Sequence, residues 1–168
     1  MLRRLASCVA ALGCAALVGC GSDGGDPVAG ERSAATAEFT DGGVHVALSL
    51  GTGERPSLVA RFRPLRAGFH LYSAHLPVGG VQGLGQRTSV QPAGALRAAG
   101  PMRMSAPVHD LLIRPLHLTL PVYPDGPVTA RLPIRRAGTG PSQVSVSYAA
   151  CSDRVCYPPV KNHVVDLG

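Results

Sequence analysis

Short runs in which apolar and polar residues alternate recur along most of the chain. Side chains of a strand point to opposite faces in turn, so such alternation is typical of strands with one buried face. The pattern predicts seven to nine short strands and no helix, with the clearest strands at 44–50, 58–62, 68–72, 88–91, 116–120, 128–134, 144–148 and 164–167. The chain is therefore expected to be an all-β protein.

Turn-forming residues separate these runs. The 168 residues include 21 glycines and 15 prolines but no tryptophan, so the core must be filled mainly by Val, Leu and Ala. Residues 51–56 are expected to form a turn, and 78–86 and 100–110 loops. Pro133 indicates an edge strand or a bulge, because proline cannot donate a ladder hydrogen bond. Strands of this length and spacing favour a single immunoglobulin-like β-sandwich.

The N-terminus has the pattern of an export signal. Met1-Leu2-Arg3-Arg4 is a short basic start, and Leu5–Val18 is apolar or small throughout. The run ends Leu17-Val18-Gly19-Cys20, which resembles the lipobox of bacterial lipoproteins. We therefore expect a lipoprotein signal peptide at 1–19, a lipidated Cys20 with a flexible tether over 20–36, and the folded domain at 37–168. This places the domain outside the cytoplasm, anchored to a bacterial membrane.

The charge of the chain does not indicate a nucleic-acid-binding protein. Its formal net charge is +6, but the arginines are scattered and few aromatic residues are available to stack on bases. Nucleic-acid binding requires a basic stripe or patch. The glycines of 78–86 do not indicate a phosphate site either, because no strand-to-helix context follows them.

The expected export leaves one pair of free cysteines. Cys8 and Cys14 depart with the signal and Cys20 carries the lipid, so Cys151 and Cys156 remain in an oxidising compartment. A bridge that closes so short a loop stabilises a fold less than a long-range bridge does. From the residues alone, a redox-active pair and a structural disulfide both stay open.

Nearby residues leave further alternatives. Arg154 lies between the two cysteines and can stabilise a thiolate, whereas Asp153 opposes it. A copper or zinc site built on the two thiols, with His163 or His75 as an added ligand, is a third option, although no Cys–His spacing matches a familiar metal site. A non-catalytic immunoglobulin-like binding lipoprotein with a structural disulfide is the remaining alternative.

Three stretches resemble one family. Tyr148-Ala149-Ala150-Cys151…Cys156-Tyr157-Pro158-Pro159 is similar to the signature of the N-terminal periplasmic domain of the thiol:disulfide interchange protein DsbD. Gly68–Tyr72 and Leu118–Val122 resemble two strands of the same domain, in the same order and rough spacing. The resemblance covers about residues 37–168 and implies an immunoglobulin-like sandwich with the cysteines at one end.

The resemblance also implies a function. Electrons would pass from a DsbD-like or CcdA-like transmembrane protein, or from a thioredoxin-like protein, to periplasmic disulfide oxidoreductases or cytochrome c maturation proteins. Cys156 would form the mixed disulfide with the partner and Cys151 would resolve it, with no cofactor beyond the two thiols. The family's aromatic strand maps onto Tyr72 and His70, which would line the cysteine pair.

The sequence departs from the family in several ways. The cysteine spacing is one residue shorter, and the family's aromatic cap loop maps onto 105–108, where no aromatic residue occurs. No transmembrane segment or thioredoxin-like domain follows Gly168, so the electron donor is expected to be a separate chain. His70 stands where the family has an aromatic residue. It is either a local base for a thiol or, as we favour from the sequence, a strand-surface histidine. Asp110 and Asp125 have no evident partner.

Overall fold

The computed structural model describes residues 33–167, in which thirteen strands and one short 3₁₀ helix are formed. The expected signal peptide, the expected lipidation site Cys20 and most of the expected tether lie outside these residues. Within them, no helix is long and apolar enough to cross a bilayer.

The larger sheet is antiparallel and has the strand order β1-β2-β3-β10-β6, with β7 also paired to β10. Its strands are β1 (Ser33–Asp41), β2 (Val44–Gly51), β3 (Ser57–Pro64), β10 (Val128–Arg136), β6 (Leu96–Ala98) and β7 (Arg103–Met104). Buried and half-buried residues alternate along β2, as expected of a strand with one face toward the core.

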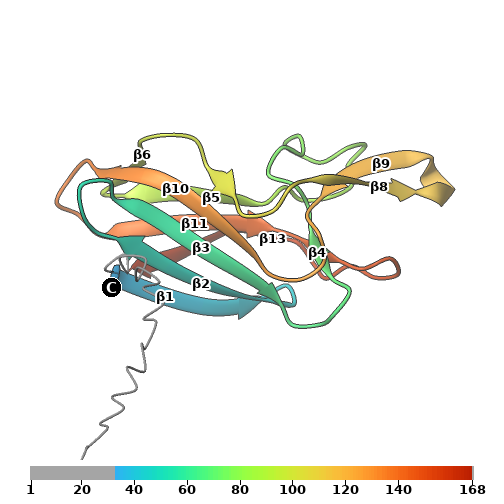
Figure 1. The fold of residues 1–168 in the computed structure, drawn as a ribbon, viewed down its shortest axis with the longest axis horizontal. Coiled ribbons are helices and arrows are strands. Elements are labelled where there is room, and N and C mark those ends of the chain that lie inside the picture. The colour runs from blue at the N-terminus through green and yellow to red at the C-terminus, as the bar shows by residue number, and fades with distance from the viewer. Residues whose placement is uncertain (1–32, 168) are drawn as a thin grey trace, which may run out of the picture. The chain divides into compact units, whose positions relative to one another are not determined.

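The second sheet is also antiparallel and has the order β13-β11-β5. It comprises β13 (Val160–Leu167), β11 (Ser142–Tyr148) and β5 (Ser89–Gly94). Figure 1 shows this sheet behind the larger one. Apolar side chains from both sheets form the main buried cluster, in which the rings of Phe62 on β3 and Tyr148 on β11 meet edge to face at 5.5 Å. The expected all-β, immunoglobulin-like sandwich is confirmed.

Smaller elements extend the sandwich at one end (Figure 1). There, β4 (His70–Leu71) pairs with β12 (Ala150–Cys151), and β8 (His109–Ile113) pairs with β9 (Leu118–Val122) in a hairpin that carries the 3₁₀ helix η1 (Arg114–Leu116) at its turn. A second buried cluster fills this end and consists of Tyr72, Leu76, Leu118, Leu120, Val122, Ala149 and Cys151. One of the two cysteines therefore belongs to a small core of its own.

The expectation that residues 100–110 form a loop is wrong in part. It contains β7 and the beginning of β8, and Leu116, which was expected in a strand, lies in η1. Strands of two residues are too short to show alternation, and the β8 sequence His-Asp-Leu-Leu-Ile does not alternate. These pairings come from tertiary packing and not from a local pattern.

Pro133 does not lie at a sheet edge, because β10 has β3 on one side and β6 and β7 on the other. The carbonyl of Pro133 accepts a hydrogen bond from Ala99 N at 2.8 Å, so its nitrogen faces the same side. On that side β7 pairs only with residues 130–131 of β10 and β6 only with 134–136. The proline thus falls where the neighbouring strand is interrupted and no donor is needed.

Candidate redox site

Cys151 and Cys156 are joined by a disulfide, and their Cα atoms lie 4.0 Å apart. The two residues form an antiparallel bridge across the turn 152–155. This turn is closed by the bond from Ser152 N to the Val155 carbonyl at 2.8 Å, and beyond it Tyr157 N donates to the Ala150 carbonyl at 3.0 Å. The backbone pairing brings the cysteines slightly closer than the ~4.4 Å lower limit usual for disulfides.

The two cysteines differ in exposure. Cys151 is 3% exposed, whereas Cys156 is exposed to solvent. Cys151 is buried because it ends β12, which pairs with β4 and packs into the second cluster. Cys156 follows the turn and lies outside both clusters. A partner protein can therefore reach the sulfur of Cys156 far more easily than that of Cys151.

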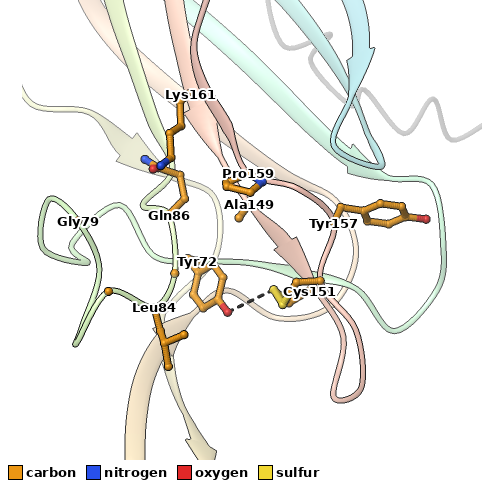
Figure 2. Close-up of a pocket in the computed structure, with 12 residues that line it drawn as sticks. Tyr72, Gly79, Leu84, Gln86, Ala149, Cys151, Tyr157, Pro159 and Lys161 are labelled. Carbon is orange, nitrogen blue, oxygen red and sulfur yellow. Dashed lines mark hydrogen bonds between the residues drawn. A yellow bond between two sulfur atoms is a disulfide. The ribbon is translucent and has the colours of Figure 1, made fainter.

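Tyr72 contacts the buried sulfur directly. Its hydroxyl donates a hydrogen bond to Cys151 Sγ at 3.2 Å (Figure 2). The residue is held by an isolated bridge to Val122 and by Thr88 Oγ1, which donates to the Tyr72 carbonyl at 2.7 Å. Burial raises the pKa of Tyr72 above its ordinary value of 10.0, so the hydroxyl remains a donor at neutral pH.

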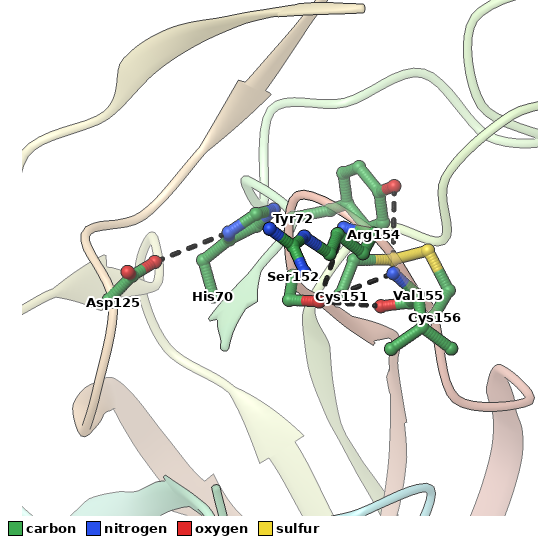
Figure 3. A network of polar contacts seen from close by, with 8 residues as sticks. All are labelled: His70, Tyr72, Asp125, Cys151, Ser152, Arg154, Val155 and Cys156. Carbon is green, nitrogen blue, oxygen red and sulfur yellow. Dashed lines mark hydrogen bonds and ion pairs between the residues drawn. A yellow bond between two sulfur atoms is a disulfide. The ribbon is translucent and has the colours of Figure 1, made fainter. Parts of the chain in front are cut away.

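His70 is buried, so its interpretation as a strand-surface histidine is wrong. Its side chain is only 4% exposed, and Nδ1 lies 3.3 Å from Oδ1 of Asp125 (Figure 3). The expectation that Asp125 has no partner is therefore also wrong. The segment that carries Asp125 runs along β4, because Tyr123 N donates to the Leu71 carbonyl and Gly126 N to the Phe69 carbonyl.

Arg154 lies in the exposed turn between the cysteines. Its backbone nitrogen donates to Ser152 Oγ at 3.3 Å, while its guanidinium makes no hydrogen bond or ion pair within residues 33–167. Asp153 beside it is equally exposed. The turn therefore brings one positive and one negative charge close to the disulfide, both in contact with solvent.

A groove of about 270 Å³ opens beside the disulfide (Figure 2). Besides the disulfide it is lined by Tyr72, Gly79, Gly83, Leu84, Gly85, Gln86, Ala149, Tyr157, Pro159 and Lys161. The glycine-rich loop at 78–86 thus forms one wall. Gly85 has a φ of +82°, and a Cβ added to it would lie 3.2 Å from the Tyr72 ring, so only glycine lets the loop approach this closely.

Residues 105–108, onto which the family's cap loop was mapped, do not line this groove. Residues 106–108 line a separate hollow with Met104, His75 and Tyr123. The sequence analysis therefore missed the loop that does border the disulfide, as well as Leu84 and Lys161. The frequent glycines of this loop were a local sequence sign of its tight path, and several of them adopt positive φ values.

Neither histidine suggested as an added metal ligand lines the groove. His75 is exposed beside the other hollow, and the ring of His163 stacks on Phe39 with their centroids 4.0 Å apart. Within residues 33–167, no group of three or more His, Cys, Asp or Glu side chains is arranged to hold a metal ion.

Comparison with known proteins identifies the family. The sequence family described as the N-terminal domain of the thiol:disulfide interchange protein DsbD matches residues 36–167. No curated protein sequence matches significantly. Among solved structures, the N-terminal periplasmic domain of ScsB from Proteus mirabilis is similar in fold, with a TM-score of 0.56 and 13% identity. The match covers 81% of this chain and 51% of that one, so the chain spans about half the length of that structure.

The DsbD N-terminal domain of Neisseria meningitidis in its reduced form also matches, with a TM-score of 0.45 and 19% identity over 75% of this chain and 91% of that one. The family match covers most of the chain, including both cysteines, and agrees with the three sequence stretches that suggested it. The chain belongs to the family of N-terminal domains of the thiol:disulfide interchange protein DsbD.

Proposed function

We propose that this chain carries electrons outside the cytoplasm by thiol–disulfide exchange through Cys151 and Cys156. The observation that carries the proposal is the unequal exposure of the two cysteines in a domain of this family. Exchange requires one sulfur that a partner can reach and a second close enough to displace that partner. The exposed Cys156 suits the first role, and the buried Cys151, bonded to it, suits the second.

In the proposed reaction, the Cys156 thiolate of the reduced chain attacks a partner disulfide. A bond forms between Cys156 and one partner sulfur, and the other partner sulfur leaves as a thiolate that takes a proton from solvent. The Cys151 thiolate then attacks Cys156 Sγ, which re-forms the Cys151–Cys156 disulfide and releases the second partner sulfur. Two electrons move to the partner, and the chain ends oxidised.

Tyr72 supports the second step. Its hydroxyl lies 3.2 Å from Cys151 Sγ, and the raised pKa keeps it protonated. A protonated hydroxyl at this distance donates to a thiolate and stabilises it. Tyr72 therefore favours the ionised form of Cys151 that attacks the mixed disulfide.

We propose that partners bind in the groove beside the disulfide. Its wall combines apolar groups such as Leu84, Ala149 and Pro159 with the single lysine side chain of Lys161. We assign the donor role to a DsbD-like or CcdA-like transmembrane protein or a thioredoxin-like protein. The acceptors would be extracytoplasmic disulfide oxidoreductases or cytochrome c maturation proteins. A lipid on Cys20 would hold the domain at the membrane, and the two thiols would suffice without a cofactor.

The test is to trap the partner. In a Cys151→Ala variant, Cys156 should attack the partner disulfide, and no resolving thiol remains, so a mixed disulfide with a membrane or extracytoplasmic protein should accumulate. The control is Cys156→Ala, which keeps the buried sulfur and should trap far less. Equal trapping by the two variants, or none by either, would contradict the proposal and favour a structural disulfide.

A further inference from the structure

His70 is buried, contacts Asp125 and is paired across the strands with Cys151, and one of its ring nitrogens has no hydrogen-bond partner. Nδ1 contacts Asp125 Oδ1 at 3.3 Å, while Nε2 is fully buried and unpaired. Figure 3 shows the contact between the imidazole and Asp125. Buried polar atoms are nearly always paired, so an unpaired one requires an explanation.

The contact with Asp125 fixes the proton on the ring. An ionised carboxylate only accepts hydrogen bonds, so Nδ1 carries the hydrogen and donates it. In the neutral imidazole Nε2 is then a bare lone pair. The arrangement leaves a buried basic nitrogen ready to accept a proton.

The strand register places the His70 side chain on the same face as Cys151. His70 of β4 is paired directly with Cys151 of β12. Side chains of directly opposed residues lie on the same face, with Cβ atoms about 4.5–5.5 Å apart. Tyr72 is two residues further along and shares that face, and its ring meets the His70 ring edge to face at 6.3 Å. His70 is thus the direct cross-strand neighbour of the cysteine that resolves the mixed disulfide.

We propose that His70, oriented by Asp125, accepts the proton of the Cys151 thiol when this cysteine resolves the mixed disulfide. This inference rests on the proposed function. The S–H proton moves to Nε2, and the imidazolium formed pairs with the Asp125 carboxylate. The Cys151 thiolate attacks Cys156 Sγ, the bond between Cys156 and the partner breaks, and the partner sulfur leaves with the electron pair. The partner thiolate then takes up a proton from solvent, and His70 later releases its proton to solvent.

The other charged and titratable groups around Cys151 do not supply this base. Tyr72 already donates to the sulfur, and its raised pKa keeps its proton in place. Asp125 faces the imidazole. Asp153 and Arg154 lie in the solvent-exposed turn. Among these groups, His70 alone combines burial, cross-strand pairing with Cys151 and an unpaired ring nitrogen.

The test separates the two sulfur steps. The reduced full chain is mixed rapidly with one equivalent of the aromatic disulfide 5,5′-dithiobis(2-nitrobenzoate), and release of the coloured thiolate is followed. Attack by Cys156 releases the first thiolate, and resolution by Cys151 releases the second. Cys151→Ala should give the first release only, which assigns the two phases.

His70→Phe should slow the second release about 100-fold near pH 7, since general bases contribute about 10²–10⁴-fold. The first release should stay within about twofold of the unmodified chain, because Cys156 attacks without this base. The second rate of His70→Phe should rise steeply with pH because the thiol must ionise without a base, whereas that of the unmodified chain should depend less on pH. Asp125→Asn should give a smaller slowing and a shifted pH profile, and it retains the buried ring if the phenylalanine variant folds poorly.

The matched control is His45→Phe. His45 forms a similar contact with a carboxylate, Glu38, at 3.1 Å, but it lies on β2, in the larger sheet. Both of its rates should equal those of the unmodified chain. Equal slowing of both phases by His70→Phe, or an unchanged pH profile of the second phase, would overturn the role of His70 but not the proposed exchange. A single release from the unmodified chain would instead show that the proposed exchange itself fails.

Discussion

The Cys151–Cys156 disulfide closes a small ring, and reducing it should cost the domain little stability. The two cysteines are five residues apart in sequence. In the chain-entropy model, a crosslink of this span contributes about 2 kcal/mol to the free energy of unfolding, compared with about 4.7 kcal/mol for a loop of about 100 residues. A disulfide that opens and closes in every cycle requires this modest contribution, because the reduced domain must remain folded.

The packing supports the same expectation. The main cluster between the two sheets contains neither cysteine, and Cys151 lies in the smaller cluster at the end of the sandwich. Pairing of β12 with β4 and the backbone hydrogen bond from Tyr157 to Ala150 also hold this end in place. Reduction removes one covalent link while these contacts remain.

The assay is urea unfolding followed by circular dichroism, with and without a reductant. We expect a single cooperative transition in both conditions and a free energy of unfolding lower by about 2 kcal/mol after reduction. Cys156→Ser is the control, since it changes only an exposed sulfur and should behave as the reduced chain does in either condition. Loss of more than about 5 kcal/mol, or unfolding on reduction alone, would refute the argument and favour a structural disulfide.

Three further predictions concern two tyrosines and one glycine. Tyr72→Phe removes the hydroxyl that donates to Cys151 Sγ. Because this donor stabilises a Cys151 thiolate more than the disulfide sulfur, the reduction potential against glutathione should fall, by about 10–30 mV for a net difference of about 0.5–1.5 kcal/mol. An unchanged or higher potential would contradict this. Burial raises the pKa of Tyr72 and Tyr148, so the folded state holds their protons more tightly than the unfolded state does. The free energy of unfolding measured in urea should therefore fall as the pH rises above 10.0, by up to about 1.4 kcal/mol per pH unit for each tyrosine, and Tyr148→Phe should reduce that slope. Gly43 has a φ of +71°, and a Cβ there would collide with the Tyr157 ring beside the disulfide. Gly43→Ala should therefore lower the free energy of unfolding by more than about 1 kcal/mol and slow thiolate release by Cys156. An unchanged free energy of unfolding would contradict this and show that the ring moves freely.

The sandwich was predictable because its long strands have one buried face each. In β2 and β11 the buried residues fall largely on alternate positions, and the sequence shows the same alternation. The short elements around the site were not predictable in this way. β4 and β12 have two residues each, and β7 pairs with only two residues of β10, so no periodic pattern can form.

The chemistry of the cysteine pair was only partly readable from the sequence. The two cysteines and Tyr72 belong to recognisable motifs, but the partner of His70 is 55 residues away in the chain. Nothing local to Asp125 indicates that the segment carrying it runs along β4. Counting back from Leu118 likewise could not reveal that an earlier glycine-rich loop borders the disulfide.

The unequal exposure of the two cysteines follows from the path of the chain between β11 and β13. Both strands belong to the smaller sheet, but the residues between them leave it and pair with β4 instead. This excursion carries Cys151 into the second cluster, and the four-residue turn then returns the chain with Cys156 on the outside. Pro158 and Pro159, which cannot donate ladder hydrogen bonds, lie exposed just before β13 rejoins the sheet at Val160. The tight turn, closed by the bond from Ser152 N to the Val155 carbonyl, thus separates a buried sulfur from an accessible one and forms part of the proposed exchange site.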